Sequence, residues 1–209
     1  MDADFSIELG REDPVLDFPW TDPSGKFAYV DLKRHPELLA RIEEAQTFPE
    51  LAEFLSMMNS PQSMVETAKC DVWATTELNA EEEIYNASHK FASYVDVVFT
   101  DAMFSHTFSD NAARLSLPAH EQFARKLVEL LHRAPETPSM AEICVRRCYF
   151  APDSQDSQDR KIEDEQVQEG CYCTVYVSGY GTDQPSARHN WGIALKLVGN
   201  ATLQLSRVD

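Results

Sequence analysis

Four cysteines in the second half of the chain are the residues whose types and spacing come nearest to a metal site. Cys144 and Cys148 precede Cys171 and Cys173, and two cysteine pairs that meet in a hairpin could complete a tetrahedral zinc site. The spacings C-x-x-x-C and C-x-C differ, however, from the pairs that structural zinc prefers.

The register of the two strands that carry these cysteines provides a stronger test. If the apolar faces of the strands coincide, Val145 shares a face with Cys173, whereas Cys144 and Cys148 point to the opposite face. A slip of one residue would gather the four thiols but would divide the hydrophobic face that normally fixes register. We therefore expect reduced cysteines that pack as small apolar residues, and neither a metal nor another cofactor.

Two adjacent arginines in the first of these strands offer a possible anion site. Because side chains alternate along a strand, Arg146 and Arg147 face opposite sides, and the same register aligns Arg147 with the apolar residues. A buried guanidinium needs a carboxylate or several carbonyl groups. Arg147 is therefore expected to form an ion pair near the end of the strand, and the alternative is an anion-binding arginine in a pocket.

The histidines offer one conceivable metal site. His106 and Asp110 are four residues apart, and His120 could join them if the loop folds onto the start of the next helix. An aromatic loop followed by a helix start explains the same residues, and we favour that interpretation. Cys70 is expected to be a core thiol, because its neighbour Lys69 lies on the other face of the strand and cannot lower the pKa of the thiol.

Glycine and aromatic residues favour the C-terminal region as the place for a ligand or partner. Five of the seven glycines fall within residues 170–199, and two of them lie within residues 177–183, where they permit an unusual turn. The candidate contact residues are Arg147, Tyr180, His189 and Trp191. Trp73 is a further aromatic candidate, although a lone tryptophan more often closes the edge of a core.

Recognisable catalytic motifs are absent from the sequence. No glycine lies between residues 26 and 169, so the dinucleotide fingerprint, the phosphate loop and the nucleophile elbow are all missing. The catalytic residues, if any, stay unidentified, and the sequence favours a protein that is not an enzyme.

The charge of the chain limits its partners. The formal net charge is −17, and the acidic excess is concentrated in residues 1–24, 77–83 and 153–169, a pattern typical of solvated segments. A basic stripe for nucleic acid, a membrane-spanning apolar stretch and a secretory signal are all lacking. We expect a soluble, cytoplasmic protein that binds neither nucleic acid nor membrane, and the sequence leaves its oligomeric state open.

Hydrophobic periodicity predicts a single α+β domain over residues 1–209. Its sheet should be mainly antiparallel, with helices on one face and a strand-rich C-terminal part. We expect strands at 64–75, 90–100, 142–150 and 170–178, a further segment of strand composition at 26–32, and helices at 36–46, 49–59 and 118–133. Residues 1–25 should form an irregular N-terminal arm and residues 151–169 an acidic mobile loop. Residues 186–198 should form a helix that stops at Gly199, with one arm of a hairpin as the alternative.

Two functions are compatible with these features. The first is a non-catalytic interaction or regulatory module that binds another protein, since no set of catalytic residues converges. The second is a small-molecule-binding protein or enzyme with a pocket near residues 177–191.

Overall fold

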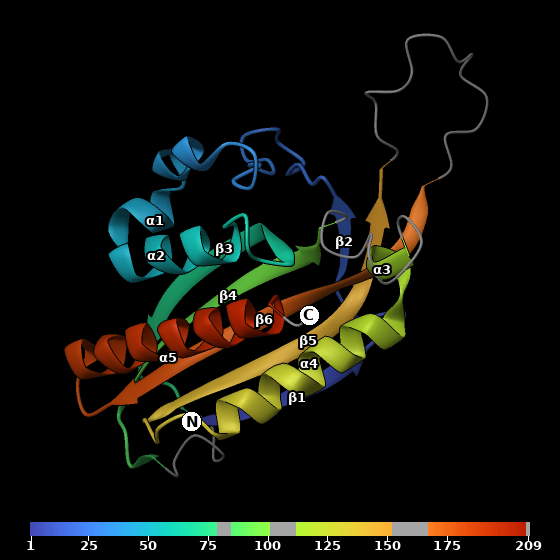
Figure 1. Cartoon of the computed structure of the whole chain (residues 1–209). Helices are drawn as coiled ribbons and strands as arrows, with labels where there is room; N and C mark the ends of the chain where they lie inside the picture. Colours follow the sequence, from blue (N-terminus) through green and yellow to red (C-terminus); the bar gives the residue numbers. More distant parts are fainter. Residues whose placement is uncertain (79–84, 101–111, 152–166, 208–209) are drawn as a thin grey trace, which may run out of the picture.

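A computed structural model describes residues 1–78, 85–100, 112–151 and 167–207, and these form an α+β fold around one mixed sheet (Figure 1). The strands are β1 (Asp2–Glu8), β2 (Val15–Phe18), β3 (Val65–Thr75), β4 (His89–Phe99), β5 (Ser139–Phe150) and β6 (Gln168–Gly181). The helices are the 3-10 helix η1 (Pro36–Arg41), α1 (Glu43–Thr47), α2 (Pro49–Met58), α3 (Ala112–Leu115), α4 (Leu117–His132) and α5 (Gln184–Leu205).

The strands follow the order β1-β5-β6-β4-β3, and β2 also pairs with β5. The pairs among β3, β4, β5 and β6 are antiparallel, whereas β1 and β2 run parallel to β5. The expectation of a mainly antiparallel sheet is therefore only partly confirmed, because the first two strands make the sheet mixed.

The first 25 residues were expected to form an irregular arm, but two ranges within them, β1 and β2, are strands of the sheet. In β1 the residues Ala3 and Phe5 pack against the core, while Asp2 and Asp4 are exposed. This is the alternation of a strand with one buried face. Residues 26–32 were expected to have the composition of a strand, but they form none. Their only β-type contact is an isolated bridge between Thr21 and Ala28.

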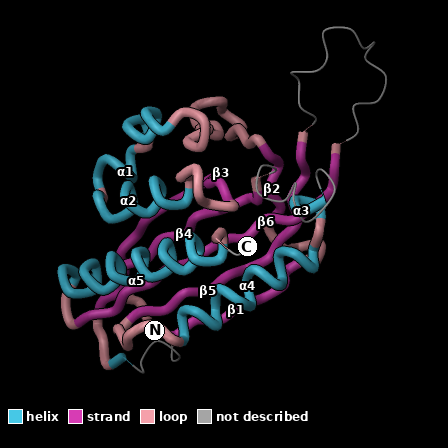
Figure 2. The backbone as a smooth tube through the Cα atoms, in the orientation of Figure 1, coloured by secondary structure: helices cyan, strands magenta, loops and turns pink. Residues whose placement is uncertain are grey.

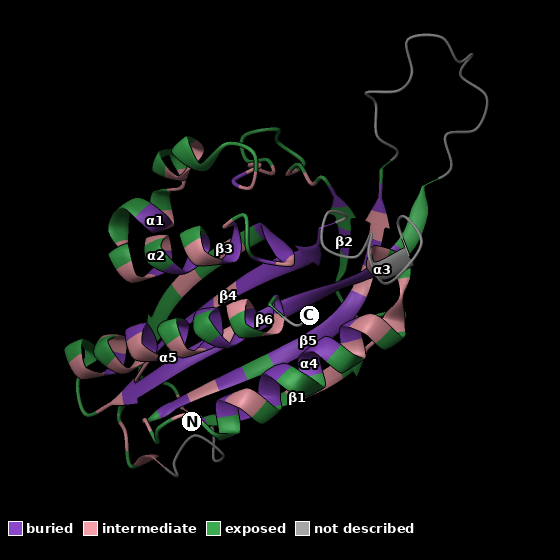
Figure 3. Cartoon of the chain, viewed as in Figure 1, coloured by how far each residue is buried: buried purple, intermediate pink, exposed green. Residues whose placement is uncertain are grey.

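Helices α2, α4 and α5 lie on the same side of the sheet (Figure 2). Their apolar residues meet the inward residues of the central strands in the main core, where Phe54, Leu127, Trp191, Val95 and Ile143 are all almost fully buried. The opposite side is covered in part by residues of β2 and the loop after it, which form a second cluster around Tyr172 and Val98. Figure 3 shows the central strands as mostly buried.

The long helix α5 confirms the helix expected at residues 186–198 and corrects the place where it ends. It begins with a capping box between Asp183 and Ser186 and has Pro185 in its first turn. It continues past Gly199 to Leu205, so this segment is not an arm of a hairpin, and the strands of the C-terminal part are β5 and β6. Gly199 is a packing contact instead of a stop, because a Cβ atom there would lie 2.8 Å from Cε of Met57 in α2.

Helices expected at 49–59 and 118–133 match α2 and α4. The helix expected at 36–46 is divided, since Ile42 has an extended conformation between η1 and α1. The expected acidic mobile loop at 151–169 lies almost entirely outside the described residues.

A β-bulge divides β3 into two halves. The register with β4 shifts between Thr67 and Lys69, which places Ala68 in the second cluster while Cys70 and Val72 pack against the main core. The carbonyl of Ala68 accepts a hydrogen bond of 2.6 Å from the indole of Trp20. The half of β3 before the bulge is thus held by the N-terminal segment, whereas the half after it is an outer edge of the sheet.

Candidate functional site

A cavity of about 420 Å³ lies beside the second half of β3. Its walls come from four separate segments of the chain: the residue before α2, strand β3, strand β4 and the start of α5. The lining residues are Phe48, Val72, Trp73, Ala74, Phe91, Gln184, Pro185 and Arg188. The cavity is therefore mostly apolar, with polar groups supplied by α5.

The backbone of β3 next to this cavity points some of its hydrogen-bonding groups away from the sheet. The N–H of Val72 donates 2.7 Å to the carboxylate of Asp71, its own neighbour, rather than to β4. Because backbone groups alternate along a strand, those of Ala74 point the same way. Since β3 is the last of the described strands in the sheet order, Val72 and Ala74 lie on an edge that pairs with no other strand in the described ranges. We call residues 72–75 the open half of β3.

Aromatic packing keeps the inner wall of the cavity in place. The rings of Phe48 and Phe91 lie 5.5 Å apart edge to face, and Phe91 also contacts Trp191 at 4.9 Å. Trp73 stands at the outer edge, where 37% of its surface is exposed. An exposed tryptophan next to an apolar cavity is typical of a contact surface.

An ion pair closes the α5 side of the cavity. Arg188 donates from Nε and Nη2 to the two carboxylate oxygens of Glu50, at 3.0 and 2.8 Å, and its guanidinium lies 5.1 Å from the centre of the Phe48 ring. The hydrogen bonds from Arg188 lower the pKa of Glu50, so the carboxylate stays charged at neutral pH. The pair holds α2 and α5 together at this rim, and the charge of Arg188 is balanced.

None of the four expected contact residues lines this cavity. Arg147 donates to the carbonyl of Gly10 at 2.6 Å instead of forming an ion pair, and His189 is exposed on α5. Tyr180 is fully buried and stacks on Tyr85, with the ring centres 4.7 Å apart. Trp191 is a core residue whose indole donates to Ser93 Oγ at 2.9 Å. The structure does not bring these four side chains together.

Of the two adjacent arginines in β5, the one with a carboxylate partner among the described residues is Arg146. Its guanidinium contacts Glu8 of β1 at 2.7 and 2.8 Å, and it donates to the hydroxyl groups of Thr174 and Tyr176 at 2.9 and 3.2 Å. This network lies on the sheet face opposite the helices. Sequence reasoning missed the pair because Glu8 was expected to lie in an irregular arm.

A buried carboxylate continues the same network. Asp96 is 6% exposed, and its Oδ1 accepts 2.6 Å from the hydroxyl of Thr174. Burial raises its pKa to about 6, although the hydrogen bond from Thr174 and the charges of Lys69 and Arg146 act in the opposite direction. The carboxyl group therefore titrates close to neutral pH.

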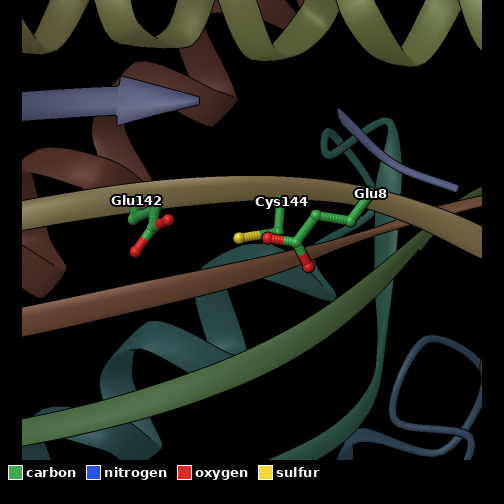
Figure 4. A group of neighbouring side chains, drawn as sticks. All are labelled: Glu8, Glu142 and Cys144. Carbon is green, nitrogen blue, oxygen red and sulfur yellow. The ribbon is translucent and has the colours of Figure 1, made fainter. Parts of the chain in front are cut away.

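One group in the described part of the chain has potential metal ligands close together: Glu8, Glu142 and Cys144, whose ligand atoms lie within 4.8 Å of one another. Figure 4 shows the Cys144 sulfur between the two carboxylates. The oxygens of Glu8 already accept hydrogen bonds from Ser6 and Arg146. Burial raises the pKa of the Cys144 thiol to about 12, so the sulfur is protonated and is a poor ligand. Protein contacts therefore account for the positions of the Glu8 oxygens.

The cysteine register agrees with the expected one: Val145 pairs with Cys173, and Cys144 pairs with Thr174 on the other face. All five cysteines are free thiols. In the other proposed metal group, His106 and Asp110 lie outside the described residues. His120 is buried against Phe99 and has its Nδ1 2.9 Å from the carbonyl of Ser116.

None of the helices in the described ranges has the length and apolar character needed to cross a membrane. Comparison with known proteins found no matching family model, no matching curated protein and no matching solved structure.

Proposed function

We propose that the chain is a non-catalytic interaction module that binds an extended segment of a partner protein alongside the open half of β3. The observation that carries the proposal is that the open strand edge and the cavity share Val72, Trp73 and Ala74. An extended peptide can add a strand to such an edge, with main-chain hydrogen bonds providing affinity and pockets for alternate side chains providing specificity.

The geometry suggests which side chains the segment carries. Val72 and Cys70 pack on the helical side of the sheet, and the cavity lies on that side between β3, Phe48 and α5. A paired segment would direct every second side chain into this cavity. Those side chains should be apolar, and the alternate ones would lie next to Trp73 on the other face.

The net charge of −17 favours a partner segment that is basic or neutral and disfavours nucleic acid. A cytoplasmic location is part of the proposal and is supported by the five free thiols, which are typical of a reducing compartment.

The test is selection from a library of random peptides of about 12 residues, followed by affinity measurements with fluorescence anisotropy. Ala74→Pro removes an edge N–H and should weaken binding of the selected peptides by about tenfold or more. Ile7→Pro is the matched control, because Phe5 N donates to Asp4 and Ile7 therefore presents its N–H to the outer side of β1, at the opposite end of the sheet. Ile7→Pro should leave peptide binding unchanged.

Backbone methylation of a selected peptide tests the pairing itself. Methyl groups on the amides that face β3 should abolish binding, whereas methyl groups on the alternate amides should have little effect. The proposal would be overturned if methylation of either set of amides reduced binding equally, or if the library yielded no peptide that binds. Selective binding of small metabolites that survives Ala74→Pro would support the second function, a small-molecule-binding protein or enzyme that uses the same cavity.

A further inference from the structure

The proposed function leaves the partner strand unnamed. Resting on that function, we infer that the open half of β3 pairs with the same strand of a second copy of this chain. The two strands run antiparallel about a two-fold axis that passes beside Trp73, and the two sheets join into one.

The directions of the backbone groups restrict the possible registers. The N–H of Val72 faces the open edge, and Ala74 presents its groups in the same direction. An antiparallel neighbour must therefore place an edge-facing residue opposite each of them. An axis at Trp73 does so, because it sets Val72 of one copy opposite Ala74 of the other. Trp73 then meets its own equivalent at a position without hydrogen bonds, where cross-strand side chains are closest.

Charges on the flanks of this segment select the same register. With the axis at Trp73, Asp71 lies opposite Thr75, and Lys69 is aligned with Glu77, which follows the end of β3 by two residues. When the ladder of the dimer continues past Thr75, each dimer contains two oppositely charged pairs and no like-charged pair. An axis at Ala74 would instead place Asp71 opposite Glu77. Both Lys69 and Glu77 are exposed, as this pairing requires.

The other outer strand of the sheet is unsuited to the same contact. Self-pairing of β1 about Phe5 would set Asp2 opposite Glu8, and Asp4 lies between them along the strand. Acidic residues on an edge strand prevent pairing of this kind. In the part of β3 after Asp71 no charged residue provides that protection.

The experiment measures the dimer dissociation constant of the full chain by sedimentation equilibrium. Lys69→Glu and Glu77→Lys should each weaken the dimer about tenfold, because each creates two like-charged pairs. An equimolar mixture of the two variants should recover the wild-type affinity as a heterodimer, since both of its pairs are then oppositely charged. Ala74→Pro should abolish the dimer and Ile7→Pro should not.

A wild-type chain that stays monomeric, or a mixture no tighter than its components, would overturn self-pairing. If such a monomer still binds library peptides through β3, self-pairing is wrong and the interaction function stands. A dimer that is sensitive to these charges, in a chain that selects no peptide, would support self-pairing and contradict binding of foreign segments.

Discussion

The hydroxyl of Thr174 donates 2.6 Å to the carboxylate of Asp96 and accepts 2.9 Å from the guanidinium of Arg146. One side chain of β6 thus joins a buried acid on β4 to a buried base on β5. Since Arg146 also contacts Glu8, the chain of hydrogen bonds extends over four neighbouring strands. All the polar atoms named here have partners, which is the condition under which a buried polar network is stable.

Replacing Thr174 by valine should destabilise the protein by about 1–3 kcal/mol, because Asp96 loses its donor while its charge stays buried. The shape of the side chain is kept, so packing changes little. Urea unfolding at pH 7 measures the difference. Thr174→Ser keeps the hydroxyl, loses only the methyl group and is the control; a Thr174→Val variant that is no less stable than Thr174→Ser would contradict the role given to the hydroxyl.

Asp96→Asn should change how stability depends on pH. Because the folded pKa of Asp96 is about 6 and thus above its ordinary value of 3.8, its contribution is favourable at low pH and is lost as the pH rises towards and through 6. The variant should therefore gain stability relative to wild type between pH 4 and 7, by about 2 kcal/mol at most. Chemical unfolding across this range tests the effect, and a variant curve parallel to that of wild type would contradict it.

His120 should change the pH dependence of stability in the direction opposite to that of Asp96. Burial lowers its pKa from 6.5 to about 4, so the folded protein keeps the ring neutral while the unfolded chain takes up a proton. Stability from this residue is present above pH 6.5 and is lost as the pH falls towards 4. His120→Asn should remove that loss, and its destabilisation relative to wild type should shrink by about 3 kcal/mol between pH 7 and pH 4.

The two residues partly cancel each other in the wild-type protein between pH 4 and 6. The double variant with Asp96→Asn and His120→Asn is the control for both experiments. Its pH dependence should be the sum of the single effects, because the two changes lie on different sides of the sheet. A double variant that follows one single variant alone would show that only that residue titrates in this range.

Gly179→Ala should be among the most damaging substitutions in the chain. A Cβ atom at Gly179 would lie 2.1 Å from the backbone nitrogen of Trp191 and 2.4 Å from the carbonyl oxygen of Ala187, so α5 would have to move away from β6. We expect a loss of about 3 kcal/mol or more, or failure to fold.

Gly192→Ala provides the comparison for Gly179→Ala. At Gly192 the nearest atom to an added Cβ is Cγ of Glu50 at 3.0 Å, a side chain that can shift, and alanine improves helix propensity by about 1 kcal/mol. Its melting temperature should stay close to wild type. A similar loss in both variants would contradict the close approach of α5 and β6 at Gly179.

Sequence patterns predicted the elements that depend on local periodicity. The alternation of Phe91, Val95, Val97 and Phe99 on one face of β4 is confirmed, as is the register between β5 and β6. Strand β1 was missed because it pairs with β5, more than 130 residues away, and its acidic residues and the prolines that follow resemble a solvated arm. The same distance explains why the partner of Arg146 could not be read from the sequence.

The candidate site was harder to predict than the strands. The cavity exists because Phe48, Trp73 and Pro185 meet in space, and no spacing in the sequence relates these three positions. The C-terminal region did contain a signal, since Gln184, Pro185 and Arg188 line the cavity. Tyr180 and Trp191 of this region were predicted as contact residues because they are aromatic. Both are instead large side chains that are fully buried in the core.

The bulge after Thr67 separates two halves of β3 that contact different neighbours. On one side, Glu66 contacts Tyr29 and also Arg114 of α3, and at the bulge itself Ala68 accepts a hydrogen bond from Trp20, so this part of β3 is held by the N-terminal segment and by α3. Beyond the bulge, Cys70 and Val72 pack against the main core, while Trp73 lies beside Tyr94 and next to the cavity. An extra residue in the ladder re-aims the side chains that follow it, so Cys70 and Val72 face the helices although Ala68 lies in the second cluster. The bulge thereby determines which face of the strand lies beside the cavity.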